Sequence, residues 1–146
     1  KCETLFMDTG PAGIMGAFCD KKVEEYREKG LVIVNIGNQH VICSIVKGDR
    51  IFAILEHHSR EMNEENILDV IKRFKERNIT DEEVFEGRGH GVCFSVDLTE
   101  DTSAWPVIIT GPKRQLASGG DYYFAVPNGD MMLTGCFGLV EGARKI

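Results

Sequence analysis

Four histidines fall at the ends of predicted strands or in predicted turns, and imidazole has the most versatile chemistry among the side chains there. Two predicted strands flank Gly48-Asp49, a dipeptide that suits a two-residue hairpin loop. In that register His40 lies directly opposite His57, with Cβ atoms about 4.5–5.5 Å apart, and His58 points to the other face of the sheet. Because imidazole titrates near neutral pH, His40 and His57 are candidate catalytic bases or anion ligands.

The histidines leave three interpretations open: hydrogen-bonded structural residues, ligand contacts, or metal ligands. A metal site of His40, His57 and Glu56 is the least favoured, because side chains alternate along a strand and Glu56 points away from His57. No metal-ligating residue is therefore predicted. His90 lies between two glycines that would let a ligand approach. Cys93 follows in an apolar segment and is predicted to be a buried thiol rather than a partner of His90.

Two glycine-containing turns at predicted strand ends are candidates for phosphate binding. The apolar segment 31–36 leads into a turn whose backbone N–H groups can face an anion, and Gly37 leaves room for a phosphate. The apolar segment 107–110 ends in a turn with two basic residues that can pair with a phosphate or carboxylate. A plain hairpin turn and a solvated basic turn are the alternatives. The predicted ligand-binding residues are Asn35, Gly37, Asn38, Gln39, His40, Gly111, Pro112, Lys113 and Arg114.

Asp130 is the third candidate catalytic residue, after His40 and His57. It stands just before the last predicted helix, Met131–Val140. An aspartate there caps the helix through its side chain, which is the favoured interpretation, and an acid in that place can also orient a ligand.

The elements that would position these residues form a mixed α/β pattern. Apolar runs predict strands at 31–36, 40–46, 50–57, 92–96, 107–110 and 122–126, and Asn63 is a helix cap before a segment with one apolar face. Small residues at 12–18 favour a closely packed helix entered through Pro11. We therefore expect a sheet of about five strands, an antiparallel meander followed by parallel strands, with helices on both faces.

Composition excludes several classes of protein. The chain has 146 residues, a net charge of −6 and a pI near 5.2, which suits one domain and argues against a nucleic-acid surface. No apolar run reaches the about 20 residues of a membrane span. Five scattered cysteines without a Cys-x-x-Cys pair predict neither disulfides nor an iron–sulfur cluster, and they are typical of the cytoplasm.

The order of these patterns resembles one ribonuclease-H-like lobe of the actin, sugar-kinase and heat-shock-chaperone ATPase superfamily. The resemblance rests on segments similar to the interlobe helix, the second phosphate loop, the adenosine motif and the C-terminal helix of that superfamily. These segments are Asp8–Ala17, Val34–His40, Val107–Pro112 and Leu133–Leu139. The resemblance implies ATP with Mg²⁺ as ligand and an acid near the metal, but the corresponding position is Asn35. That difference places metal-dependent phosphoryl transfer in doubt.

Thr110–Arg114 and Gly129–Leu139 also resemble a largely archaeal family of unknown function. That family is labelled "putative pyruvate formate-lyase activating enzyme". The label implies a radical S-adenosylmethionine enzyme, whose cluster needs three closely spaced cysteines. The sequence contains no such spacing.

These patterns favour an ATP- or phosphate-binding kinase- or ATPase-like protein of unknown substrate. The alternatives are a non-catalytic binding or regulatory protein with the same fold, and the disfavoured radical activating enzyme. We expect residues 1–146 to be the C-terminal lobe of a longer two-lobed protein. The expected partners are a nucleotide and the N-terminal lobe, with no nucleic acid and no membrane. An apolar patch near Ala12–Phe18 would be exposed in the isolated lobe and would favour a homodimer.

Overall fold

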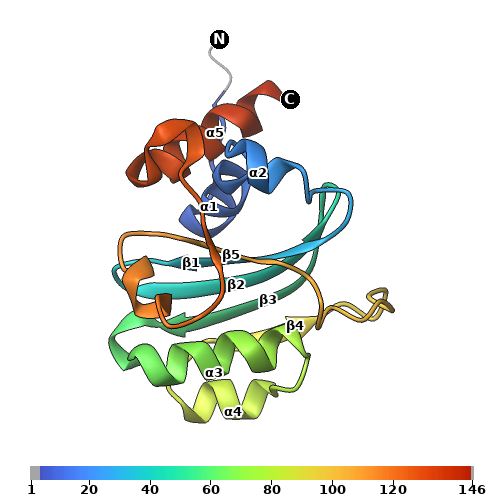
Figure 1. The fold of residues 1–146 in the computed structure, drawn as a ribbon, viewed down its shortest axis with the longest axis vertical. Helices are drawn as coiled ribbons and strands as arrows, with labels where there is room; N and C mark the ends of the chain where they lie inside the picture. The colour runs from blue at the N-terminus through green and yellow to red at the C-terminus, as the bar shows by residue number, and fades with distance from the viewer. Residues whose placement is uncertain (1–3, 146) are drawn as a thin grey trace.

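A mixed β-sheet with the strand order β4-β3-β2-β1-β5-β6 forms the centre of the computed structural model, which describes residues 4–145 (Figure 1). Strands β1 to β4 pair antiparallel in succession, and β5 and β6 continue the sheet in parallel on the other side of β1. The predicted meander followed by parallel strands is confirmed, with six strands instead of about five. The strands are β1 (Leu31–Ile36), β2 (His40–Lys47), β3 (Arg50–His58), β4 (Gly91–Phe94), β5 (Val107–Thr110) and β6 (Tyr123–Phe124).

Helices cover both faces of the sheet, as the sequence predicts (Figure 1). One face carries α1 (Thr9–Ala17), α2 (Lys21–Glu24) and α5 (Thr134–Arg144), and the other carries α3 (Glu64–Lys75) and α4 (Asp81–Glu86). Within residues 4–145, no helix combines the length and apolar character that crossing a membrane requires. Short 3₁₀ helices lie in the connections: η1 (Ser59–Glu61), η2 (Arg114–Ala117), η3 (Pro127–Gly129) and η4 (Met131–Leu133).

Reciprocal side-chain caps begin the two helices on the α3 face. Asn63 caps α3 as predicted, and Asn66 accepts a hydrogen bond from the Asn63 N–H in return. Thr80 and Glu83 form the same arrangement at α4, a helix that the sequence analysis missed although its capping box is visible in the sequence. The connection between β5 and β6 is made by the 3₁₀ helix η2.

Each face of the sheet has its own hydrophobic core, and β1 contributes to both. Val32, Val34 and Ile36 pack in the cluster that contains the buried residues of α3. Leu31 and Ile33 pack in the cluster that contains the buried residues of α1 and α2. A strand buried on both faces has a continuous apolar sequence instead of an alternating one, which explains the run at 31–36.

Glycines allow α1 and α5 to touch backbone to backbone. A Cβ atom on Gly16 would lie 1.7 Å from the Thr134 carbonyl oxygen, and one on Gly138 would lie 1.9 Å from the Ala12 carbonyl oxygen. No side chain fits at either position. The prediction that small residues permit close packing of this helix is confirmed.

The β2–β3 hairpin has the predicted two-residue turn at Gly48-Asp49 but not the predicted register throughout. Val46 pairs with Ile51, whereas Ile45 pairs with Ala53, so Phe52 is an extra residue in β3. This β-bulge shifts every later pair by one residue.

The bulge removes a charged residue from the hydrophobic core. In the unbulged register Glu56 would lie opposite Val41, a fully buried residue on the α3 face. With the bulge, Leu55 takes the buried face and Glu56 is half-exposed. Burial of an unpaired carboxylate is far more costly than one bulge. The alternation of Leu55 and Glu56 therefore determines the register, and the turn does not.

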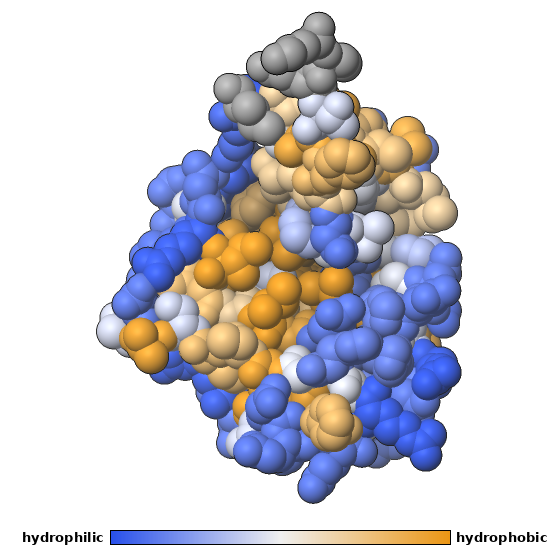
Figure 2. All heavy atoms as spheres, turned by 180° about the vertical axis from the view of Figure 1, so that it is seen from behind, coloured by the Kyte–Doolittle hydropathy of each residue, from blue (hydrophilic) through white to orange (hydrophobic). Residues whose placement is uncertain are grey.

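Ile14 and Phe18 are buried in the core below α1, so the helix itself exposes little of the apolar surface that was expected near Ala12–Phe18. Figure 2 shows instead a hydrophobic area in the middle of one side, between the two helical layers. An apolar hollow lies beside α1, and Ile51 and Ile54 of β3 are partly exposed. The apolar residues that line the hollow are Pro11, Ile14, Met15, Phe18, Val46 and Ile51.

Asp20 connects the start of α2 to β6 and to the segment that follows β6. It is nearly buried, and its carboxylate accepts hydrogen bonds from the Lys22 N–H at 3.0 Å, the Tyr123 hydroxyl at 3.0 Å and the Val126 N–H at 2.8 Å. Burial raises the pKa of Asp20, but these hydrogen bonds outweigh that effect, so its pKa lies below the ordinary value.

We predict that Asp20→Asn lowers the free energy of unfolding by about 1–3 kcal/mol at pH 7, because two acceptor bonds are lost or weakened. Since the folded pKa lies below the unfolded one, the carboxylate's contribution is complete above about pH 4 and disappears as the pH falls through the folded pKa. Urea unfolding of both proteins between pH 3 and 7 measures this. Asp69→Asn on the exposed side of α3 is the control. Equal stability of wild type and Asp20→Asn at pH 7 would contradict the prediction.

Candidate functional site

Three turns meet at the end of the sheet where β1 and β5 finish. The Ser59 hydroxyl donates to the Gly37 carbonyl oxygen at 2.7 Å, and the Ser59 N–H donates to the Gln39 carbonyl oxygen at 2.7 Å. The Lys113 N–H donates to the Ile36 carbonyl oxygen at 3.0 Å. The β1–β2 turn is therefore held between η1 and the turn after β5. Both turns predicted from sequence lie side by side.

Asn35 lies between α1 and the turn after β5. It pairs with Thr110 in the parallel register of β1 and β5. A Cβ atom on Gly13 would lie 2.3 Å from Asn35 Nδ2, and one on Gly111 would lie 2.5 Å from Asn35 Oδ1. Gly111 also has φ of +99°, a conformation that favours glycine. The Asn35 amide therefore occupies a space that exists because residues 13 and 111 are both glycines.

A groove with two basic residues opens between η1 and η2. Arg60 and Lys113 lie on it, together with one acid, Glu64. Arg60 is also within 3.1 Å of Glu61. One guanidinium nitrogen of Arg114 is buried without a hydrogen-bond partner among the described residues, an unusual state for a charged donor. The full lining is Ser59, Arg60, Met62, Glu64, Lys113, Gln115 and Leu116.

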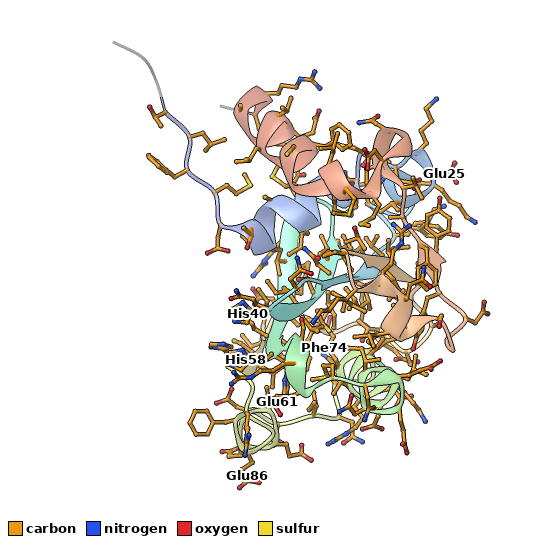
Figure 3. The ribbon with its side chains drawn as sticks, turned by 90° about the vertical axis from the view of Figure 1, so that its left-hand side faces the viewer. Glu25, His40, His58, Glu61, Phe74 and Glu86 are labelled. Atoms are coloured by element: carbon orange, nitrogen blue, oxygen red, sulfur yellow. The ribbon has the colours of Figure 1, made fainter. Side chains whose placement is uncertain are left out.

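The structure brings together three histidines: His40 in β2, His58 in β3, and His90, which directly precedes β4. Because of the β3 bulge His40 pairs with His58, and the predicted pairing of His40 with His57 is wrong. One nitrogen atom from each ring lies within 4.8 Å of the other two. Figure 3 shows His40 and His58 at the same edge of the molecule. Partial burial lowers the pKa of His58, and the neighbouring His90 and Arg60 lower it further.

His57 lies on the opposite face of the sheet and is 6% exposed. Its ring packs below the loop between α4 and β4: Cβ atoms on Gly87 and Gly89 would lie 3.2 Å and 2.8 Å from ring atoms of His57. Burial lowers the pKa of His57. The glycines before His90 therefore make room for a core histidine. The predicted approach of a ligand through the glycines beside His90 is therefore replaced, at Gly89, by a contact with His57.

Asp130 lies between η3 and η4, shortly before α5 begins. It caps η4 by accepting a hydrogen bond from the Met132 N–H at 2.9 Å. Of its two predicted roles, the capping role is confirmed, and its catalytic role stays a prediction. The hydroxyl oxygens of Thr134, at the start of α5, and Thr110, at the end of β5, are 3.3 Å apart. The first residue of α5 therefore contacts the last residue of β5.

The described cysteines do not gather in one place. Cys43 lies in the core, where burial raises the pKa of its thiol to about 12. Cys93 is exposed, so the prediction of a buried thiol is wrong, because β4 is an edge strand. Cys19 and Cys136 are also free thiols, and Cys2 lies outside the described residues.

Sequence reasoning missed His58 and His90 as neighbours of His40. One signal was available: Glu56 would have been buried in the unbulged register, which indicates a one-residue shift and places His58 opposite His40. The position of His90 depends on α4 and on the pairing of β4 with β3, where the His90 N–H donates to the Glu56 carbonyl oxygen at 2.9 Å. No local pattern in the sequence predicts that contact.

Fold and site together define an α/β protein with its candidate residues at one end of a mixed sheet. The chain belongs to the family DUF1786, described as "Putative pyruvate format-lyase activating enzyme", which matches residues 1–116. The resemblance to this family is therefore confirmed; the matched part contains Thr110–Arg114 but not Gly129–Leu139. Searches of curated proteins and of solved structures found no match to the chain. The resemblance to the ATPase superfamily stays a prediction.

We predict that Gly111→Ala lowers the free energy of unfolding by about 2 kcal/mol or more, because the new methyl group would meet the Ile36 carbonyl oxygen at 2.4 Å and φ is positive. Gly135→Ala is the matched control. A Cβ atom on Gly135 has nothing within 4 Å and this glycine lies in α5, so alanine is expected to stabilise by about 0.5–1 kcal/mol. Chemical denaturation of the wild type and of both variants measures the free energy of unfolding of each. Equal stability of Gly111→Ala and wild type would refute the close approach of the two strand ends.

Proposed function

We propose that the chain is a ribonuclease-H-like lobe that binds a phosphate-bearing ligand, with ATP as the expected nucleotide. The observation that carries the proposal is the parallel pairing of β1 with β5. It sets the turn after Ile36 beside the turn after Thr110, two segments that the sequence analysis assigned to phosphate binding separately. Ligands of α/β sheets bind beyond the carboxyl ends of parallel strands, where both turns lie.

The strand order supports the lobe assignment. A central strand with an antiparallel hairpin on one side and parallel strands on the other agrees with the resemblance to the actin, sugar-kinase and chaperone superfamily. In this structure β4 adds one strand at the hairpin edge. The glycine contact of α1 with α5 agrees with the small-residue helices on which that resemblance rests.

The chemistry of the groove suits an anion. Arg60 and Lys113 supply positive charge at its wall. Arg114, next to Lys113 in the chain, does not line the groove but has a buried donor without a partner among the described residues. Cationic donors are the usual phosphate ligands in proteins. The volume of the groove, about 490 Å³, lies within the range of small-molecule sites.

Asn35 favours a second candidate function, binding without catalysis. The superfamily resemblance implies an acid at this position that holds the water around Mg²⁺, and an amide supplies no negative charge. Gly13 and Gly111 enclose the amide on two sides. We therefore propose nucleotide binding as the retained property. Kinase- or ATPase-like phosphoryl transfer would need an acid from the expected N-terminal lobe, and a non-catalytic regulatory protein is the alternative.

The family description suggests a third activity, radical activation of an enzyme. An iron–sulfur cluster needs several cysteine thiolates close together. The four cysteines in the described part of the chain form no such group. That part offers no support for a radical mechanism.

We predict that Lys113→Ala raises the dissociation constant for ATP about tenfold in the full-length protein, because one charge-assisted hydrogen bond to phosphate is lost. Lys72→Ala, an exposed lysine on α3, is the matched control and is expected to bind as wild type does. Thermal shifts with ATP and with ADP measure both proteins; saturation at 100 times the dissociation constant stabilises by about 2.7 kcal/mol.

The residues 1–146 alone are expected to bind ATP weakly, since the proposed cleft needs a second lobe. No thermal shift of the full-length protein with any nucleotide would overturn the proposal. Tight Mg²⁺-dependent binding by residues 1–146 alone would overturn its two-lobe form.

A further inference from the structure

We infer that His40, His58 and His90 form a binding site for a divalent transition metal, with zinc as the physiological ion. This site lies outside the basic groove and does not depend on the proposed nucleotide binding. The sequence predicted no metal ligands, because its register separated these histidines.

The spacing of the three imidazoles suits one ion. The ring centroids of His40 and His58 are 5.1 Å apart, those of His40 and His90 are 5.0 Å apart, and those of His58 and His90 are 4.5 Å apart. Three nitrogen atoms, one from each ring, lie within 4.8 Å of one another. Tetrahedral zinc with Zn–N bonds of about 2.0–2.1 Å needs nitrogen separations of about 3.3 Å. Small side-chain rotations therefore bring the ligands to bonding distance.

The sheet holds the three ligands in place. His40 and His58 are directly paired residues at the ends of β2 and β3. His90 directly precedes β4, and its N–H donates to the carbonyl oxygen of Glu56 in β3. Ligands placed by paired strands are more precisely positioned than ligands in loops, so little ordering is needed when a metal binds.

A carboxylate lies behind one of the ligands. Glu56 Oε1 is 3.7 Å from His40 Nδ1, and both side chains are only partly exposed. A carboxylate beside the second nitrogen of a metal-binding imidazole orients the ring and increases its basicity. This arrangement leaves Nε2 of His40 for the metal. The bulge that takes Glu56 out of the core thus also puts it beside this ligand.

The donor set selects the ion. Three neutral imidazoles bind Zn²⁺, Co²⁺, Ni²⁺ or Cu²⁺, whereas Mg²⁺ and Ca²⁺ prefer oxygen ligands. Three protein nitrogens leave a fourth tetrahedral position for water or a ligand, as in catalytic zinc sites, whereas structural sites use four protein ligands. His58 is followed directly by Ser59 and Arg60, two residues of the basic groove. His90 is exposed and His40 and His58 are only partly buried, so the fourth position faces solvent at this end of the sheet.

Metal titration of the full-length protein tests the inference. After treatment with EDTA, the wild type is expected to bind one Zn²⁺ per chain by calorimetry. Co²⁺ is expected to give the visible absorption of a tetrahedral site, and Mg²⁺ to give no binding signal. His40→Ala, His58→Ala and His90→Ala should each weaken Zn²⁺ binding at least a hundredfold, and Glu56→Gln about tenfold.

The matched control is His57→Asn, which removes the fourth histidine of the chain on the other face of the sheet. This variant is expected to lose stability but to bind Zn²⁺ as wild type does, and circular dichroism verifies the fold of every variant. If His57→Asn misfolds, Lys72→Ala serves as a folded control. The inference is overturned if the wild type binds no zinc, if alanine at all three histidines leaves the affinity unchanged, or if Co²⁺ gives only an octahedral spectrum.

Discussion

The parallel pairing of β1 with β5 is the constraint on which the rest of the structure depends. β1 packs into both hydrophobic cores through its five apolar residues, and its register with β5 pairs its one polar residue, Asn35, with Thr110. That pairing alone fixes how closely the two turns at the end of the sheet approach. The approach is so tight that glycine is required at position 111. The contact between the two turns and the enclosed Asn35 amide are consequences of one strand pair.

Local chemistry in the sequence predicted most of the fold. Continuous apolar runs located β1 and β5, Gly48-Asp49 located the hairpin turn, and Asn63 located the start of α3. These signals succeed because their physical causes lie within a few residues. The 3₁₀ helix η2 between β5 and β6 was not predicted, because a single 3₁₀ turn has no strong sequence pattern.

The candidate site was only half predictable for the same reason. Turns with glycine and basic residues are local, so their positions at strand ends could be read directly. The histidine cluster depends on cross-strand register and on an edge strand formed after two helices, and neither is a local property. The decisive clue was the polarity of Glu56, which counts against the simplest hairpin only when the opposite residue, Val41, is known to be buried. Register prediction therefore needs the burial of both strands at once.

The extra residue Phe52 gives this hairpin two alternative registers that differ by one residue. If the ladder closed without the bulge while Phe52 stayed in the chain, the two faces of β3 would be exchanged from residue 52 to the end of the strand. Leu55 and Glu56 would change places, and the buried His57 would replace His58 opposite His40. Loss of Phe52 itself would have the opposite effect and lock the observed pairs, because Ile51 and Ala53 already pair with the consecutive residues Val46 and Ile45. The bulge is thus a removable feature of β3, whereas the pairing that it permits is the property that the cores require.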